Sequence, residues 1–307
     1  MDAMNAILDK YGMIQVVIVK TMKRFFALLA AVFLLLSGCT QQPADAQIAA
    51  TTLPVYEFTA ALCDGTGLSV TRLVTENVSC LHDYTLNVRQ AQAAEAADLI
   101  IISGAGLEDS MTDILESKEM VDCSAGIQSL ECNHDHEHSH HHGEDAHIWL
   151  SPDNAKIMAA NICVGLSAKY PQHAETFAAN LSGLLADIDT VKAYGEAQLS
   201  QLSCRELITF HDGFGYLAEA FDLTILHAIE EESGSEASAH ELKELIGLVR
   251  EHSLVAIFTE RSGSTSAAGI IAAETGAKVY SLDMAMAGNS WFDAMYHNID
   301  TLKEALG

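Results

Sequence analysis

The chain has 307 residues, of which 49% are hydrophobic and 19% are charged. It is long enough for about two domains and apolar enough to bury a core, which excludes a chain that is disordered throughout. Its 16 basic residues face 42 acidic ones, giving a formal net charge of −26. This balance argues against nucleic acid or an anionic lipid surface as a partner and is compatible with a cationic ligand.

The N-terminal region has the pattern of an export signal. A basic start at residues 22–24 (MKR) precedes an apolar run over residues 25–36, and a small-residue processing site ends at Cys39. The apolar run is short for a membrane span. The sequence therefore predicts a signal peptide over residues 1–38, and a short membrane anchor is the alternative interpretation. Met22 is an alternative start, because the residues before it fit no part of a usual signal.

Residues 36–39 (LSGC) resemble a bacterial lipobox. The resemblance implies that Cys39 becomes the lipidated first residue of the mature protein and that residues 39–47 form a polar tether behind the lipid. The bulk of the chain is then expected at the outer face of the cytoplasmic membrane, which is the periplasm if the cell is Gram-negative.

Six cysteines remain after Cys39, and an even number in an exported chain permits disulfides. About 15 complete pairings exist, and Cys123 with Cys132 is the first candidate because the two lie close together around a predicted loop. No pair has the Cys-x-x-Cys spacing, which argues against a thiolate zinc site. The six are Cys63, Cys80, Cys123, Cys132, Cys163 and Cys204.

Beyond the tether, strand-like apolar runs alternate with helical patterns, first over residues 48–103 and again over residues 206–306. This alternation is typical of parallel sheets flanked by helices. The predicted fold class is therefore α/β, with two lobes that each contain a mainly parallel sheet. Strands are expected at residues 48–53, 68–75, 98–103, 206–210, 254–259 and 278–282, and helices at residues 56–62, 88–97, 214–221, 240–250, 267–275 and 291–306.

A long helical stretch separates the two sets of elements, and we predict one helix over residues 172–203. Its apolar residues recur at three- and four-residue steps from Phe177 to Val191, which is the pattern of a helix with one buried stripe. We expect this rigid helix to join an N-terminal lobe (residues 48–171) to a C-terminal lobe (residues 204–307). A stiff connector of this length implies that the lobes hinge little.

A run of histidines interrupts the N-terminal lobe at residues 133–142 (NHDHEHSHHH). The run has almost nothing apolar to bury, so a mobile loop is expected. Neutral imidazoles at this density bind Zn²⁺, Cu²⁺ and Ni²⁺, although an inert solubilising segment is the alternative. Mobile ligands set no fixed geometry, so the run predicts auxiliary metal handling. Its histidines are His134, His136, His138, His140, His141 and His142.

A defined metal site needs ligands held by rigid elements, and three single histidines stand in suitable places. His82 follows a predicted strand of the first lobe, His147 precedes a helix, and His211 directly follows the first strand of the second lobe. Asp283 ends the last predicted strand. Groups just past the carboxyl ends of parallel strands converge on a ligand crevice, and three imidazoles with one carboxylate satisfy tetrahedral Zn²⁺. Taken singly, each histidine is more often a surface or satisfied core residue than a metal ligand.

Around these residues the chain resembles the metal-binding solute receptors of bacterial ABC uptake systems, specifically their zinc-type branch. The resemblance covers nearly the whole mature chain, and its segments occur in the family's order. The matching segments are residues 81–84 (LHDY, against PHDY), 145–159 (DAHIWLSPDNAKIMA, against DPHIWLSPENAKIMA), 210–218 (FHDGFGYLA, against FHDAFGYFA), 258–283 and 296–298. A histidine-rich segment before the second of these segments is also typical of the zinc branch.

The resemblance implies that His82, His147 and His211 bind Zn²⁺, with Asp283 as the fourth ligand or a carboxylate held close by. Manganese receptors of the family usually have Glu where His211 stands, so the third position favours zinc. Residues 284–287 (MAMA) fit the family poorly, and water is therefore the alternative fourth ligand. Candidates for the acids that orient the imidazoles, each equally readable as an ordinary surface or capping acid, are Asp83, Asp145, Asp212 and Glu260.

On this resemblance we expect an extracytoplasmic, high-affinity zinc receptor that delivers Zn²⁺ to an ABC permease. The lipid on Cys39 would hold it at the membrane, and a monomer without a nucleic-acid partner is expected. The histidine loop would gather Zn²⁺ or sense its supply, with gathering ranked first. A binding protein rather than an enzyme is predicted, because the chain lacks the phosphate loop of an ATPase and the Gly-x-Ser-x-Gly motif of a serine hydrolase.

Three alternatives remain open from the sequence. A manganese or iron receptor, or a metal-binding adhesin, would have the same fold. An exported zinc hydrolase belongs to another class, and it would need an open metal position together with a general base.

Overall fold

The computed structural model describes residues 47–76, 78, 81, 84–130, 144–228, 238–261, 263 and 265–307. The signal peptide, Cys39 and all but residue 47 of the tether lie outside the described residues, and so does the histidine loop. The residues from Asp45 to Gly307 form one compact unit. Within the described ranges, no helix has the length and apolar character of a membrane span.

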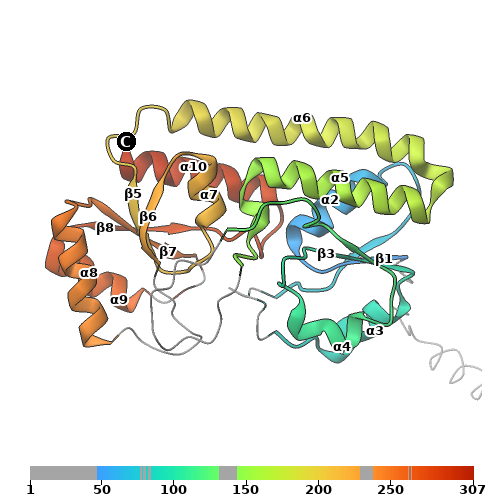
Figure 1. Ribbon diagram of the computed structural model, residues 1–307, viewed down its shortest axis with the longest axis horizontal. Helices are drawn as coiled ribbons and strands as arrows, with labels where there is room; N and C mark the ends of the chain where they lie inside the picture. The colour runs from blue at the N-terminus through green and yellow to red at the C-terminus, as the bar shows by residue number, and fades with distance from the viewer. Residues whose placement is uncertain are drawn as a thin grey trace, which may run out of the picture. The chain divides into compact units, whose positions relative to one another are not determined.

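Two four-stranded sheets build the described structure, and every strand pairing in them is parallel (Figure 1). This confirms the prediction of two α/β lobes with parallel sheets. The first sheet has the order β2-β1-β3-β4 and consists of β1 (Ile48–Ala50), β2 (Val70–Arg72), β3 (Leu99–Ile102) and β4 (Met120–Asp122). The second has the order β6-β5-β7-β8 and consists of β5 (Glu206–Thr209), β6 (Thr224–Ala228), β7 (Ala256–Glu260) and β8 (Lys278–Leu282).

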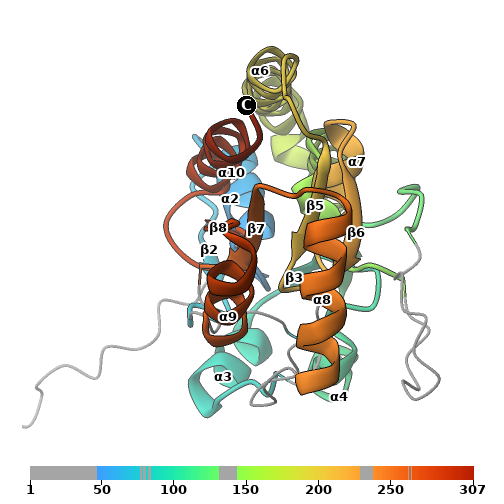
Figure 2. The ribbon, with the colours of Figure 1, turned by 90° about the vertical axis from the view of Figure 1, so that its left-hand side faces the viewer.

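Helices surround both sheets. The first lobe contains α2 (Leu53–Cys63), α3 (Val88–Ala96), α4 (Thr112–Leu115) and α5 (Pro152–Lys169), with short 3₁₀ turns at η1 (Asp109–Met111), η2 (Ile148–Leu150) and η3 (Pro171–His173). The second contains α7 (Gly215–Ala220), α8 (Ala239–Glu251), α9 (Ser266–Thr275) and α10 (Trp291–Leu306). In Figure 2, α6 (Ala174–Gln198) and α10 lie together above the strands of the second sheet.

The long helix α6 is present and covers 25 residues, close to the predicted span. Its buried stripe includes Phe177, Leu184, Ile188 and Val191, as the sequence spacing indicates. The helix packs against α2 and α5 of the first lobe and against α10 of the second, so one rigid element touches both lobes.

Capping residues explain where several helices begin. The Ser151 hydroxyl accepts a hydrogen bond from the backbone of Asn154, and Pro152 occupies the first turn of α5, where its missing N–H costs nothing. Ser238 and Glu241 form a reciprocal capping box at the start of α8. These local signals fix the entry into the helices independently of packing.

The edge strands differ from the sequence expectations. The predicted strand over residues 68–75 is reduced to β2, while β4 and β6 have no predicted counterpart. All three lie at the edges of their sheets, where partly exposed, polar-containing segments lack the continuous apolar run that marks a central strand. The central strands β1, β3, β5 and β7 all fall within or overlap predicted strands.

The hydrophobic core continues from one lobe into the other. The fully buried Trp149 and Trp291 lie at this junction. Trp149 donates its indole N–H to the carbonyl of Met284 at 2.8 Å, and Trp291 donates to the carbonyl of Trp149 at 2.9 Å. The two lobes are therefore held together by buried apolar contacts and two indole hydrogen bonds, as well as by α6.

The described cysteines Cys63, Cys123, Cys163 and Cys204 are free thiols. The expected Cys123–Cys132 disulfide is therefore wrong for this structure, and Cys132 itself lies outside the described residues. Cys123 is fully buried directly after β4, and burial raises the pKa of its thiol well above the usual value. The disulfide was expected because the two cysteines lie close in the sequence, and that argument did not consider that Cys123 is buried.

Candidate metal centre

His147 enters the interior of the molecule just before η2, and its side chain is only 3% exposed. Both its backbone N–H and its Nδ1 lie against Asp145 Oδ1, at 2.8 and 2.9 Å. Because an ionised carboxylate only accepts hydrogen bonds, Nδ1 carries the proton in this arrangement. The lone pair of the imidazole is then on Nε2, the nitrogen that a metal would bind.

His211 comes from the other lobe, two residues after the end of β5. Its Nε2 lies 3.3 Å from Nε2 of His147, and the two rings are nearly perpendicular at 88°. The carboxylate of Glu260, at the end of β7, lies 3.9 Å from His211 Nδ1. The carboxyl ends of β5 and β7 thus supply the second imidazole and an acid behind it, as expected for a parallel sheet.

The separation of the two Nε2 atoms fits a shared metal ion. Zinc binds histidine nitrogens at about 2.0–2.1 Å in tetrahedral geometry, which places two such nitrogens about 3.3 Å apart. The observed distance of 3.3 Å equals that value. Two imidazoles from different lobes therefore lie within hydrogen-bonding distance, as close together as two ligands of one zinc ion would be.

Asp283 is the predicted fourth ligand or nearby carboxylate. It follows β8, but its carboxylate accepts hydrogen bonds from Arg261 Nη1 at 2.9 Å and from the backbone N–H of Ala285 at 2.8 Å. Across the described ranges, no three His, Cys, Asp or Glu side chains are grouped closely enough to hold an ion. The structure therefore brings together His147 and His211 and directs the Asp283 side chain toward Arg261.

The remaining predicted site residues have mixed outcomes. His82 and Asp83 lie outside the described residues, as do all six histidines of the loop. Among the acids expected behind the imidazoles, Asp145 contacts His147 and Glu260 lies near His211, whereas Asp212 is half-buried in the turn after His211.

Two residues beside the imidazoles, Gly213 and Met284, were not predicted as site residues. Gly213 is buried between the rings of His147 and His211, and Met284 packs against the same point. Both stand where this chain departs from the receptor motifs it resembles, Gly213 in place of Ala and Met284 in the poorly matching MAMA segment. Those two departures from the motifs were the only features of the sequence that could have pointed to Gly213 and Met284.

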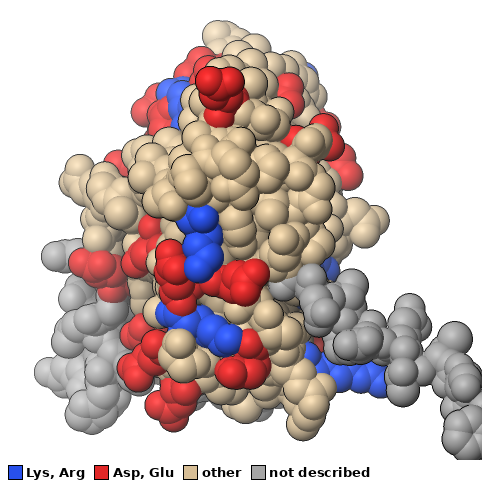
Figure 3. All heavy atoms as spheres, turned by 90° about the vertical axis from the view of Figure 1, so that its right-hand side faces the viewer, with Lys and Arg blue, Asp and Glu red and all other residues tan. Residues whose placement is uncertain are grey.

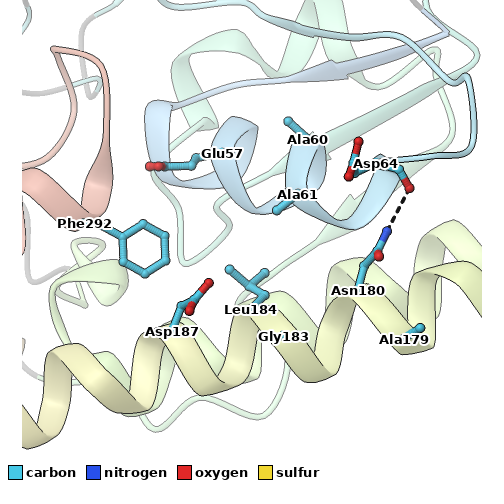
Figure 4. Close-up of a pocket in the computed structure, with 10 residues that line it drawn as sticks. All are labelled: Glu57, Ala60, Ala61, Asp64, Ala179, Asn180, Gly183, Leu184, Asp187 and Phe292. Atoms are coloured by element: carbon cyan, nitrogen blue, oxygen red, sulfur yellow. Dashed lines mark hydrogen bonds between the residues drawn. The ribbon is translucent and has the colours of Figure 1, made fainter.

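An open groove of about 570 Å³ lies elsewhere, between α2 and α6 (Figure 4). Glu57 and Asp187 line it together with small residues such as Ala61 and Gly183, and Asn180 closes one end by donating to the carbonyl of Asp64 at 2.9 Å. The groove does not include the imidazole pair. A bare ion held by side-chain nitrogens needs no cavity of this size, so the groove has no part in the metal centre.

Comparisons with known proteins identify the family of this chain. A family model described as zinc-uptake complex component A, periplasmic (ZnuA) matches residues 48–305. The zinc-binding lipoprotein AdcA of Streptococcus pneumoniae is 30% identical over 92% of this chain, which spans only 61% of that relative's length. The high-affinity zinc uptake system protein ZnuA of Bacillus subtilis is 28% identical over 91% of this chain and 96% of its own.

A solved structure supports the same assignment. The crystal structure of a ZnuA deletion mutant with zinc bound has a TM-score of 0.73 and 28% identity, over 85% of this chain and 97% of that one. The family match extends through both lobes and includes His147 and His211. The chain therefore belongs to the ZnuA family of periplasmic zinc-uptake components.

Proposed function

We propose that this chain is an extracytoplasmic receptor that captures Zn²⁺ between its two lobes and delivers it to the permease of an ABC uptake system. The observation that carries the proposal is the 3.3 Å approach of His147 Nε2 to His211 Nε2. A buried and a partly buried imidazole nitrogen at this distance would form one edge of a tetrahedral zinc site. Membership of the ZnuA family and the names of the two relatives support zinc as the cargo.

The proposed site contains His147, His211 and His82, with the last assigned from its motif alone. Imidazole is a borderline ligand that suits Zn²⁺, whereas Mn²⁺ prefers carboxylate, carbonyl and water oxygens. Each imidazole must be neutral to bind, so zinc affinity should fall as the pH drops below the usual histidine range near about 6.5. Asp145 supports His147 by holding its Nδ1 proton.

The location and partners are proposed from the N-terminal pattern and from the family. A lipid on Cys39 would anchor the receptor through the tether of residues 39–47, and the histidine loop would gather Zn²⁺ for the interlobe site. One face of the described structure carries many carboxylates around a few basic side chains (Figure 3). Such a surface raises the local concentration of cations within a Debye length of about 10 Å at 0.1 M salt. The proposed receptor acts as a monomer and binds its permease directly.

Zinc and manganese titrations of three histidine variants test the proposal. The variants are His82→Ala, His147→Ala and His211→Ala, each made in a protein whose six loop histidines are replaced by Asn to remove competing sites. We expect each variant to lose at least about a hundredfold in Zn²⁺ affinity, because one of few protein ligands is removed. His240→Ala is the matched control, because His240 is an exposed histidine on α8. Full zinc affinity in His147→Ala and His211→Ala would overturn the assignment.

A further inference from the structure

The segment that follows β8 is held in one conformation from several sides. The fully buried Asn298 of α10 accepts the backbone N–H of Asp283 at 2.7 Å and donates to its carbonyl at 2.8 Å. The carboxylate of Asp283 accepts from Arg261 and from the N–H of Ala285, at 2.9 and 2.8 Å. Ala285 itself adopts the left-handed region, with φ of +55°. The Asp283 side chain therefore stabilises a strained turn.

The same turn directs Met284 toward the two imidazoles. Its carbonyl accepts the indole N–H of Trp149 at 2.8 Å, and its side chain is buried. A Cβ built on Gly213 would lie 2.6 Å from Met284 Cε, 2.7 Å from His211 Cδ2 and 2.8 Å from His147 Nδ1. The methyl end of Met284 and both imidazole rings thus surround one point, which is vacant only because residue 213 is glycine.

We propose that Met284, and not Asp283, closes the side of the zinc site next to Gly213, as an apolar wall that makes the site selective for Zn²⁺ over Mn²⁺. The inference rests on the proposed function. Among the described residues, Asp283 forms no metal-binding group with the two imidazoles, and its carboxylate oxygens accept hydrogen bonds from Arg261 and from the Ala285 N–H. The methyl carbon of Met284, by contrast, lies beside Gly213 and next to both rings.

The wall acts through the different requirements of the two ions. Zn²⁺ is satisfied by few ligands in tetrahedral geometry and accepts water as one of them. Mn²⁺ prefers carboxylate, carbonyl and water oxygens. A thioether methyl group beside the imidazoles supplies no oxygen ligand. The apolar side chain therefore penalises Mn²⁺ while leaving the imidazole nitrogens available to Zn²⁺.

Three variants test the proposal in the protein without loop histidines: Asp283→Asn, Met284→Leu and Met284→Glu. Asp283→Asn should change Zn²⁺ affinity less than fivefold, since it alters the turn and not a ligand. Met284→Leu keeps an apolar side chain of similar volume, so the ratio of Zn²⁺ to Mn²⁺ affinity should also change less than fivefold. Met284→Glu offers an oxygen ligand in the same place and should shift that ratio toward Mn²⁺ by fivefold or more.

Each contrary result overturns the inference. A fivefold or larger loss of Zn²⁺ affinity in Asp283→Asn would make Asp283 a ligand, and the same loss in Met284→Leu would make the Met284 sulfur a ligand. If the ratio of Zn²⁺ to Mn²⁺ affinity were unchanged in Met284→Glu, Met284 would not act as a selective apolar wall. Co²⁺ provides a spectroscopic check, because its visible absorption is intense in four-coordinate sites and weak at higher coordination. We expect wild type and Met284→Leu to share one Co²⁺ spectrum and Met284→Glu to differ.

The histidine variants separate this inference from the proposed function. If His147→Ala and His211→Ala keep full Zn²⁺ affinity, the metal centre itself is misassigned. If they lose it while Asp283→Asn loses it too, the metal centre stands and only the role given to Met284 fails. Thermal unfolding of every variant confirms that the measured affinities belong to folded protein.

Discussion

At the scale of single residues, the contact between Asp145 and His147 shows how one side chain sets the chemistry of another. The carboxylate accepts both the backbone N–H and the Nδ1 proton of His147, so it fixes the orientation of the ring and the nitrogen that faces His211. Both side chains are almost fully buried, which removes water as a competing partner. The imidazole is therefore pre-oriented for an ion before the ion arrives.

We predict that Asp145→Ala lowers Zn²⁺ affinity by about 10- to 100-fold, the usual cost of losing an acid that supports a metal-binding histidine. Competition with a chelating dye measures the affinity. Glu144→Ala is the matched control, because Glu144 is the exposed neighbouring acid, and its affinity should equal that of wild type. Equal affinities in the two variants would show that Asp145 does not orient the ring.

Glu108 is a second buried acid, and it lies at the carboxyl edge of the first sheet. Burial raises the pKa of its carboxyl from 4.5 to about 7, although hydrogen bonds from Thr51, Ser103 and Gly104 favour the charged form. Between these pH values the folded protein keeps a proton that the unfolded chain releases. The stability that is present below pH 4.5 is therefore lost as the pH rises through about 7.

The raised pKa of Glu108 predicts that the free energy of unfolding depends measurably on pH. The contribution of Glu108 to the free energy of unfolding should fall by about 3 kcal/mol between pH 4.5 and pH 7.5. Glu108→Gln carries a permanently neutral group and should lack that part of the slope, whereas Glu116→Gln, at an exposed acid of the same lobe, should retain it. Urea unfolding of the three proteins at several pH values measures the difference. Parallel pH profiles for wild type and Glu108→Gln would contradict the prediction.

At the scale of elements, α6 has features that the sequence predicts and features that it does not. Its apolar stripe follows the helical period closely enough that both its existence and its buried face were predictable. The edge strands β4 and β6 were not, because pairing at an edge depends on a neighbouring strand more than on the segment's own pattern. The sequence also does not reveal how closely α6 approaches its neighbours at individual positions.

Two glycines of α6 make this difference testable. Gly195 is buried, and a Cβ there would lie 2.3 Å from Cε1 of Phe221 and 3.2 Å from Cδ1 of Ile299. Gly183 faces the open groove of Figure 4, and a Cβ there would meet nothing within 4 Å. We predict that Gly195→Ala lowers the free energy of unfolding by about 1–3 kcal/mol through overpacking. Gly183→Ala should raise it by about 0.5–1 kcal/mol through helix propensity.

Chemical denaturation measures both variants, and each serves as the other's control because the substitution and the helix are the same. Changes of equal sign would mean that helix propensity alone decides both positions, against the packing described.

The candidate metal centre, like the helices and strands, has features that were predictable from the sequence and features that were not. His147 and His211 were predictable because their motifs place them before α5 and directly after the β5 region. The position of Asp283 beyond β8 was predictable too, but its hydrogen bonds to Arg261 and Ala285 were not. Those contacts depend on a turn whose geometry comes from tertiary packing. Sequence thus located the strand ends, whereas the contacts of the side chains at those ends depend on packing.

At the scale of the whole described structure, the continuous core makes the two lobes one energetic unit. Trp149 and Trp291 are fully buried where the lobes meet, and each donates a hydrogen bond to a carbonyl there. Separating the lobes would expose both indoles to water and break both hydrogen bonds, each worth about 0.5–1.5 kcal/mol net. Unfolding one lobe alone is therefore unfavourable, and capture of an ion needs little lobe movement.

We predict a single calorimetric unfolding transition whose calorimetric and van't Hoff enthalpies agree, with and without Zn²⁺. Zinc at about a hundredfold above its dissociation constant should stabilise the whole unit by about 2.7 kcal/mol and move the transition upward without splitting it. Trp149→Phe removes the donor to Met284 and should lower the midpoint while keeping one transition. Two transitions, of which Zn²⁺ shifts only one, would show that the lobes unfold separately and that the shared core does not couple them.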